Sequence, residues 1–252
     1  MSGPLAAIAF LTRLPVPVHP QPAQIARATA WFPLGGLIVG AILLAIDRIA
    51  MRGLPPPAVD ALLVVALASV TGALHLDGLA DSADGLFGGY TPQRRLEIKR
   101  DVHTGSFGVV AIASVLLLKW AGLNALPPQV RIEAILLAPC VARFAMLPAM
   151  AVYPYAREHG VGTGYREHAG AALALGGATA LITGIALIGA GGVYVLALAA
   201  AVGLGAGALA TRLAGGVTGD VFGAIVEITE AAALLFVAAF AARGWIEAWV
   251  FA

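Results

Sequence analysis

Charged side chains are scarce in this chain. Asp, Glu, Lys and Arg together make up 12% of its 252 residues, whereas hydrophobic residues make up 60%. Soluble domains contain about 25% charged and about 45–50% apolar residues. A water-soluble globule of this composition would lack the polar surface needed to cover itself. The composition therefore predicts an integral membrane protein and excludes a disordered chain or a coiled coil.

Cysteine is almost absent as well. Cys140 is the only one in the sequence, so no internal disulfide can form and a disulfide-rich scaffold is excluded. The net charge is only +1, which argues against a nucleic-acid partner held by phosphate neutralisation. The expected surroundings are the lipid bilayer, and a homo-oligomer is left open.

Several apolar stretches are long enough to cross a bilayer, which takes about 20 residues. They cover residues 31–46 (extending to 51), 61–75, 107–126, 132–152, 169–211 and 221–242. The stretch 169–211 is too long for one crossing and is broken near its middle by Gly189, Gly191 and Gly192, so it counts as two. We predict an all-α helix bundle, one domain over 1–252, with about seven transmembrane helices.

The N-terminal stretch 3–11 is apolar but short, and no basic residue precedes it, so it does not read as a signal peptide. Prolines at 15, 17, 20 and 22 then forbid continuous helix. We expect a short interfacial or re-entrant segment here; a disordered tail is the alternative.

Basic residues divide unevenly between the two sides that alternate spans define. Four fall on one side: Arg48, Arg52, Arg131 and Arg243. Nine fall on the other: Arg13, Arg27, Arg94, Arg95, Lys99, Arg100, Arg157, Arg166 and Arg212. The positive-inside rule makes the second side cytoplasmic, with the N-terminus inside.

Acidic residues are concentrated in the segment HLDGLADSADG, residues 75–85. Asp77, Asp81 and Asp84 are spaced i, i+4, i+7 and so share one helix face. Carboxylates placed this way repel each other unless a cation lies between them, and oxygen ligands of this kind suit one or two Mg²⁺ ions. The alternative is an exposed acidic helix end. His75 faces away from the stripe and is a weaker ligand, with a substrate contact or a helix cap as its other options.

A second polar segment, RRLEIKRDVHTGSFG, follows at 94–108. Its Arg and Lys residues suit anionic groups, and Gly105 would let the backbone approach a bulky ligand. Glu97 and Asp101 are spaced i, i+4 on one face. An ordinary positive-inside loop would explain the basic residues but not Asp101 among them.

The third segment is GGVTGDVFGAIVEITE, residues 215–230. Asp220 falls in the first turn of the last span, where Thr218 could cap the helix, and capping alone is a serious alternative to a metal role. Two further acids, Glu227 and Glu230, lie deeper. Arg143, inside the fourth span, needs an acidic partner that the sequence does not identify, and Lys119 is expected to snorkel to an interface.

The sequence resembles the cobalamin synthase family of integral-membrane adenosylcobinamide-GDP ribazoletransferases. The resemblance rests on motifs in family order: FLTRLPVP at 10–17, WFPLGGLIVG at 31–40, HLDGLADSADGLFGG at 75–89, RRLEIKRDVHTGSFG at 94–108 and GGVTGDVFGA at 215–224. With the intervening spans, it covers nearly the whole chain. One departure is visible: a basic residue that often ends the family's Lys-Asp-Ser-Arg stretch is His103 here, a titratable group in place of a permanent cation.

This resemblance implies a reaction and a set of roles. The 3′-hydroxyl of α-ribazole, or of its 5′-phosphate, attacks the cobinamide-side phosphorus of adenosylcobinamide-GDP, giving adenosylcobalamin or its phosphate plus GMP. It implies Mg²⁺ held by Asp77, Asp81, Asp84 and Asp220, with Asp84 or Asp101 as the proton acceptor. It also implies the prokaryotic cytoplasmic membrane, with the site facing the cytoplasm. Expected substrate contacts are His75, Arg94, Arg95, Glu97, Arg100, His103, Gly105, Arg143 and Thr218.

Two other classes compete with this interpretation. CDP-alcohol phosphotransferases and membrane prenyltransferases also place Asp stripes at helix ends, but this chain lacks the Ala-Arg that follows Asp-Gly-x-x in the former and has one dense Asp cluster where the latter have two. A transporter would need acids near the bilayer midplane, whereas the Asp stripe lies at a span end.

Overall fold

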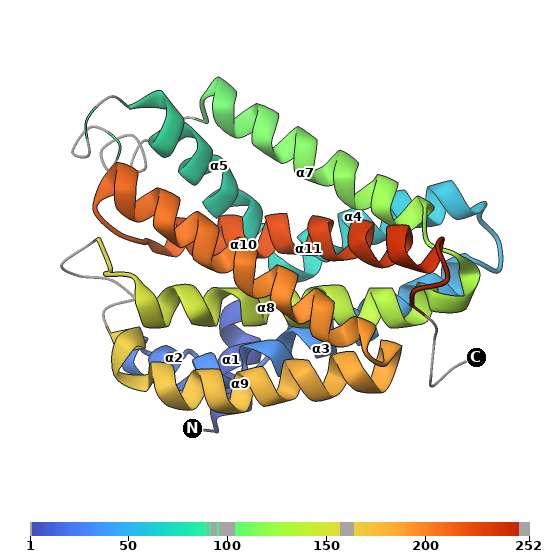
Figure 1. Cartoon of the computed structure of the whole chain (residues 1–252), viewed down its shortest axis with the longest axis horizontal. Coiled ribbons are helices and arrows are strands. Elements are labelled where there is room, and N and C mark those ends of the chain that lie inside the picture. Colours follow the sequence, from blue (N-terminus) through green and yellow to red (C-terminus); the bar gives the residue numbers. More distant parts are fainter. Residues whose placement is uncertain (1, 90, 92–94, 96–103, 157–163, 247–252) are drawn as a thin grey trace.

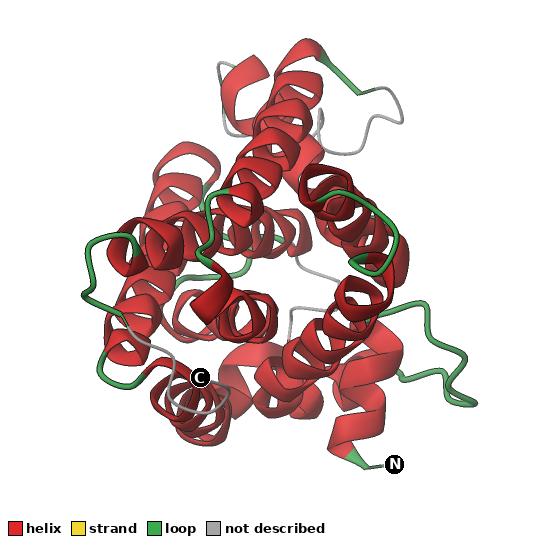
Figure 2. Cartoon of the chain, turned by 90° about the vertical axis from the view of Figure 1, so that its right-hand side faces the viewer, coloured by secondary structure: helices red, strands yellow, loops and turns green. Residues whose placement is uncertain are grey.

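The computed structural model describes residues 2–89, 91, 95, 104–156 and 164–246. In this part of the chain the regular structure is helical, and the only extended pairing is an isolated bridge between Tyr155 and Val217. Figure 2 shows most of the helices nearly end-on, packed side by side as a bundle. The predicted all-α fold is confirmed.

Ten α-helices follow one another along the described chain (Figure 1). They are α1 (Gly3–Leu11), α2 (Pro22–Ala28), α3 (Phe32–Ala50), α4 (Pro56–Thr71), α5 (Leu74–Gly88), α7 (Ser106–Asn124), α8 (Arg131–Val152), α9 (Tyr165–Ile188), α10 (Gly191–Ala214) and α11 (Gly219–Ala241). Short 3-10 turns, Thr29–Trp31 and Pro128–Val130, lead into α3 and α8.

Six described helical segments are long and apolar enough to cross a membrane, and α4 with α5 forms a bent pair that could supply a seventh span. The predicted count of about seven agrees with this. The break predicted near Gly189 is present, because Gly189 has a positive φ of 56° and separates α9 from α10. The predicted short N-terminal segment is the helix α1.

The second predicted span, 61–75, is corrected by the structure. Helix α4 ends at Thr71, and the chain resumes as α5 after a bend of 90°. Gly72 and Ala73 follow the last residue of α4, and both have left-handed backbones, with φ of 61° and 56°. This conformation interrupts the helix and separates α4 from α5. Glycine adopts this conformation readily, whereas at Ala73 it is strained. His75 therefore belongs to the first turn of α5, not to the end of α4.

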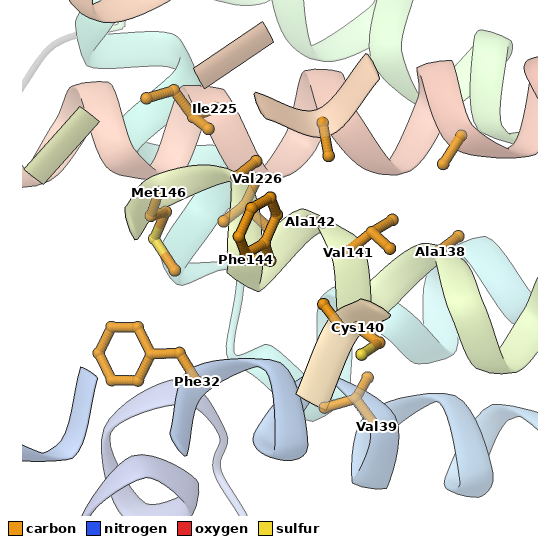
Figure 3. Close-up of a cluster of buried hydrophobic side chains, with 14 of the residues drawn as sticks. Phe32, Val39, Ala138, Cys140, Val141, Ala142, Phe144, Met146, Ile225 and Val226 are labelled. Atoms are coloured by element: carbon orange, nitrogen blue, oxygen red, sulfur yellow. The ribbon is translucent and has the colours of Figure 1, made fainter. Parts of the chain in front are cut away.

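Helix α8 forms the centre of the bundle. Every side chain from Ala138 to Met150 is buried, as expected for a helix that is apolar all round and surrounded by others. Figure 3 shows Val39 of α3 next to Cys140 on one side of α8 and Val226 of α11 on the other. A Cβ on Gly36 would lie 2.2 Å from the Pro139 carbonyl oxygen, so glycine is needed for α3 to pack this closely.

Lys119 does not snorkel, contrary to the sequence expectation. It is 2% exposed, and its Nζ lies 2.6 Å from Glu227 Oε2 and also contacts Glu230. Glu230 in turn pairs with Arg143, the buried cation whose partner the sequence left open. Two cations and two anions from α7, α8 and α11 thus form one neutral buried cluster.

A second ion-pair network joins four helices through Arg131. The guanidinium Nη2 lies 2.7 Å from both Asp47 Oδ1 of α3 and Asp60 Oδ1 of α4. Asn124 at the end of α7 donates to the other oxygen of Asp60. This network connects α3, α4, α7 and α8 near the loop that precedes α8.

Candidate functional site

The two acidic motifs meet where α5 crosses α11. A Cβ on Gly78 would lie 2.8 Å from the backbone oxygen of Asp220, and one on Gly223 would lie 3.0 Å from the backbone oxygen of His75. Only glycine at 78 and 223 allows the two helix backbones to approach so closely. The crossing places the His-x-Asp-Gly motif of α5 against the Thr-Gly-Asp motif that opens α11, although they are about 140 residues apart in the sequence.

A cavity of about 310 Å³ lies against this crossing. Asp77 and Asp220 both line it, together with His75 and two tyrosines, Tyr155 and Tyr165. The rest of its wall is mainly apolar: Phe10, Leu11, Phe32, Leu74, Met146, Met150 and Phe222, with Gly78, Gly219 and Gly223. Of the predicted stripe, Asp77 alone shares this cavity with Asp220.

Thr218 fixes the position of Asp220 at the start of α11. It is fully buried, its Oγ1 accepts a hydrogen bond from the Val221 N–H as the helix N-cap, and it donates to Asp220 Oδ2 at 3.0 Å. The predicted capping role of Thr218 is confirmed. Asp220 also benefits from the helix N-terminus, where negative charge is favoured.

Asp84 faces away from the cavity and binds the start of α7. Its Oδ2 accepts from the Gly105 N–H at 2.7 Å and its Oδ1 accepts from the Gly108 N–H at 2.9 Å. A Cβ on either glycine would lie within 2.5 Å of this carboxylate. Gly105 therefore makes room for Asp84 in this structure, where the sequence had suggested room for a ligand. The Asp84 side chain of α5 therefore caps the N-terminus of α7.

Asp77, Asp81 and Asp84 lie on α5 as predicted, but they do not converge. Asp77 is exposed, Asp81 is half-buried one turn further on, and Asp84 is 8% exposed and directed at α7. Within the described residues, no group of three His, Cys, Asp or Glu side chains is close enough to hold a metal ion. What the cavity does provide is two carboxylates with no Lys or Arg among its described lining residues. Such a wall suits Mg²⁺, which is often bound by one or two carboxylates plus substrate phosphates.

His75 lies in the cavity wall at 4% exposure. Its Nδ1 is buried and has no hydrogen-bond partner among the described atoms. His75 therefore lines the cavity without presenting this nitrogen to it, and its contact with a substrate stays a prediction.

The remaining predicted substrate contacts fall into two groups. Arg95 donates from Nε to the Leu86 oxygen at 3.1 Å and from Nη1 to the Leu213 oxygen at 2.8 Å, so it holds the ends of α5 and α10 together. Arg143 is fully buried in the ion cluster and does not line the cavity. The other predicted contacts, Arg94, Glu97, Arg100 and His103, lie outside the described residues, as does Asp101, the predicted proton acceptor.

The sequence motifs missed the aromatic wall of the cavity. Tyr165 begins α9, and its ring lies 5.8 Å from that of Phe222 in α11. Tyr155 is positioned by the bridge to Val217, in which backbone N–H groups of Ala156 and Val217 donate across the two loops. These residues come from elements that are distant in the sequence, so no local spacing could have grouped them.

Fold and site together define a polytopic membrane protein with a largely apolar cavity, into which the motif-bearing helices α5 and α11 bring Asp77 and Asp220. The chain matches the cobalamin-5-phosphate synthase family over residues 3–238. It is 43% identical to the adenosylcobinamide-GDP ribazoletransferase of Synechococcus sp. over 90% of this chain and 92% of that protein. It is also 40% identical to the protein of that name from Pseudomonas aeruginosa, over 93% and 96%.

A third relative of the same name, from Deinococcus radiodurans, is 39% identical over 91% of this chain and 83% of its own length. No solved structure matches the chain. The coverage and identity of these matches show that the chain belongs to the cobalamin-5-phosphate synthase family.

Proposed function

We propose that the chain is an adenosylcobinamide-GDP ribazoletransferase of a prokaryotic cytoplasmic membrane, with its cavity open to the cytoplasm. The reaction joins α-ribazole, or its 5′-phosphate, to adenosylcobinamide-GDP. The observation that carries the proposal is the cavity shared by Asp77 and Asp220, at a glycine-lined helix crossing, in a chain with this family membership.

In this reaction the 3′-hydroxyl oxygen of the ribazole forms a bond to the cobinamide-side phosphorus of the diphosphate. The bond from that phosphorus to the oxygen of GMP breaks, and GMP leaves with its electron pair. The hydroxyl proton passes to a carboxylate. Both oxygens of Asp84 accept backbone hydrogen bonds, so we assign the proton acceptor to Asp101, the other sequence candidate.

The cavity residues fit a divalent cation, because carboxylate oxygens are ligands that Mg²⁺ prefers and two carboxylates, those of Asp77 and Asp220, line the same cavity. We propose that Asp77 and Asp220 hold Mg²⁺ together with oxygens of the substrate phosphates. When bound, the ion neutralises charge on the diphosphate and on the departing GMP. Thr218 holds Asp220 in place, and Asp84 fixes the start of α7 beside the cavity helices. Arg94 and Arg100 remain proposed contacts for the guanosine phosphates, with Glu97 and His103 as further contacts in that segment.

The test is an assay of detergent-purified protein with adenosylcobinamide-GDP, α-ribazole and Mg²⁺. GMP release together with formation of a cobalamin supports the proposal, whereas no product from folded protein overturns it. Asp77→Asn is expected to abolish turnover without affecting membrane insertion. Glu167→Gln, which alters an exposed carboxylate at the start of α9, is the matched control and should keep full turnover.

A further inference from the structure

The wall of the cavity between α5, α8 and α11 is acidic in one part and apolar in another. Asp77 is exposed and Asp220 is half-buried, whereas Phe32, Met146 and Phe222 are 0%, 3% and 4% exposed. Acidic groups thus lie toward the solvent, and the buried part of the wall is apolar. A ligand that fits must present hydroxyl or metal-binding groups at one end and an apolar body at the other.

Three parts of the two proposed substrates have to be compared with this space: the corrin ring, the guanine and the base of α-ribazole. The corrin ring is far larger than a cavity of about 310 Å³. Guanine carries several hydrogen-bond donors and acceptors, and placing these against Phe32 and Met146 would leave them unsatisfied at a substantial cost. The dimethylbenzimidazole base of α-ribazole has no donor, one acceptor nitrogen and two methyl groups. It is the part whose chemistry matches an apolar buried wall.

His75 is the one imidazole among the described residues of this wall, but it does not offer its Nδ1 to a ligand. That atom is buried out of contact with the open space of the cavity and has no partner within the described chain. The match to the base therefore rests on the apolar side chains of the wall and not on His75.

We infer that this cavity is the α-ribazole site, with the methylated base against Phe32, Met146 and Phe222 and the ribose toward Asp77 and Asp220. Met146 is then a specificity-determining residue for the base. The inference rests on the proposed ribazoletransferase function and adds which substrate this cavity takes.

The test compares steady-state KM values of purified protein for each substrate separately. Met146→Phe, which narrows the cavity, is expected to raise KM for α-ribazole roughly tenfold or more and to change KM for adenosylcobinamide-GDP less than about twofold. Leu118→Phe is the matched control. Leu118 lines a separate apolar groove beside α5, α7 and α11 that contains neither Asp77 nor Asp220, so both KM values should stay unchanged.

A second variant covers the case in which Met146→Phe does not fold. Wild-type protein should favour α-ribazole over the nucleoside of unmethylated benzimidazole by about tenfold, because two buried methyl groups are lost. Met146→Ala removes their contact surface and should reduce this preference to about threefold or less.

The outcomes separate the two levels of the proposal. If wild-type protein releases GMP but the Met146 variants change KM for adenosylcobinamide-GDP instead of KM for α-ribazole, the function stands and the cavity assignment is overturned. An unchanged methyl preference in Met146→Ala overturns it equally. If folded wild-type protein releases no GMP from the two substrates, the proposed function itself fails.

Discussion

Two groups of charged residues in this molecule differ in how deeply they are buried. The cluster of Lys119, Arg143, Glu227 and Glu230 is fully buried, and its two cations and two anions pair with one another. In the cavity, Asp77 is exposed and Asp220 is half-buried. Charge inside a membrane protein usually marks function. Here burial separates a cluster that holds helices together from carboxylates that a substrate can reach.

Removal of one acid from the neutral cluster should have the largest effect. Glu230→Gln leaves Arg143 without its anionic partner and Lys119 with one acid instead of two, at a cost of about 3–5 kcal/mol. We expect a steep fall in melting temperature in detergent. The double variant Lys119→Met with Glu227→Gln keeps the Arg143–Glu230 pair and should be clearly more stable than Glu230→Gln. Equal melting temperatures of Glu230→Gln and wild type would show that the cluster does not hold the bundle together.

The opposite pattern is expected at the cavity. Asp220→Asn should remove several kcal/mol of charge stabilisation from the transition state. Turnover should therefore fall on the order of a hundredfold or more, while the melting temperature changes little. A Mg²⁺ titration of turnover checks the reason, because the variant should need more Mg²⁺ for half-maximal activity. An unchanged Mg²⁺ requirement would remove Asp220 from the proposed metal site.

The helix crossing offers a smaller perturbation. Gly78→Ala places a Cβ 2.8 Å from the Asp220 backbone oxygen, so α5 and α11 must separate slightly. Displacement of the facing acids should reduce turnover by about 10–100-fold, as measured in the GMP-release assay. Gly205→Ala is the matched control, since a Cβ there meets nothing within 4 Å. Comparable losses in both variants would mean that helix glycines matter generally and not at this crossing.

The helix cap should give the smallest effect. Thr218→Ala removes the N-cap of α11 and should cost about 1 kcal/mol of stability, seen as a modest fall in melting temperature. Thr218→Ser retains the hydroxyl and should therefore keep the melting temperature of the wild type. If Ser and Ala behave alike, the Thr218 hydroxyl does not stabilise the start of α11.

Much of the fold followed from the sequence because spans are set by local composition. The break at Gly189, the start of α11 and the cap at Thr218 were all predictable from neighbouring residues. The bend at Gly72 was not, since it depends on a strained backbone at Ala73, a residue type that gives no turn signal. Local patterns also set which acids share one face of α5, but not which partner each acid meets.

Partners across the fold were out of reach of sequence reasoning for a physical reason. Asp84 binds backbone N–H groups 21 and 24 residues away, and Lys119 meets an acid 111 residues away. Backbone donors have no side-chain signature, and a buried acid carries no mark of the cation it will meet. The spacing that placed Asp84 in a metal stripe was correct about the helix face and silent about this competing partner.

The contrast between the buried cluster and the cavity is tested most directly with Asp77→Asn. GMP release by this variant is compared with that of the wild type, and the melting temperature is measured on the same samples. Asp77 is exposed in the cavity, and its side chain forms no hydrogen bond or ion pair with the described residues, so we predict a variant that melts like wild type and releases little or no GMP from adenosylcobinamide-GDP and α-ribazole. Wild-type rates of GMP release from the stable variant would contradict the account.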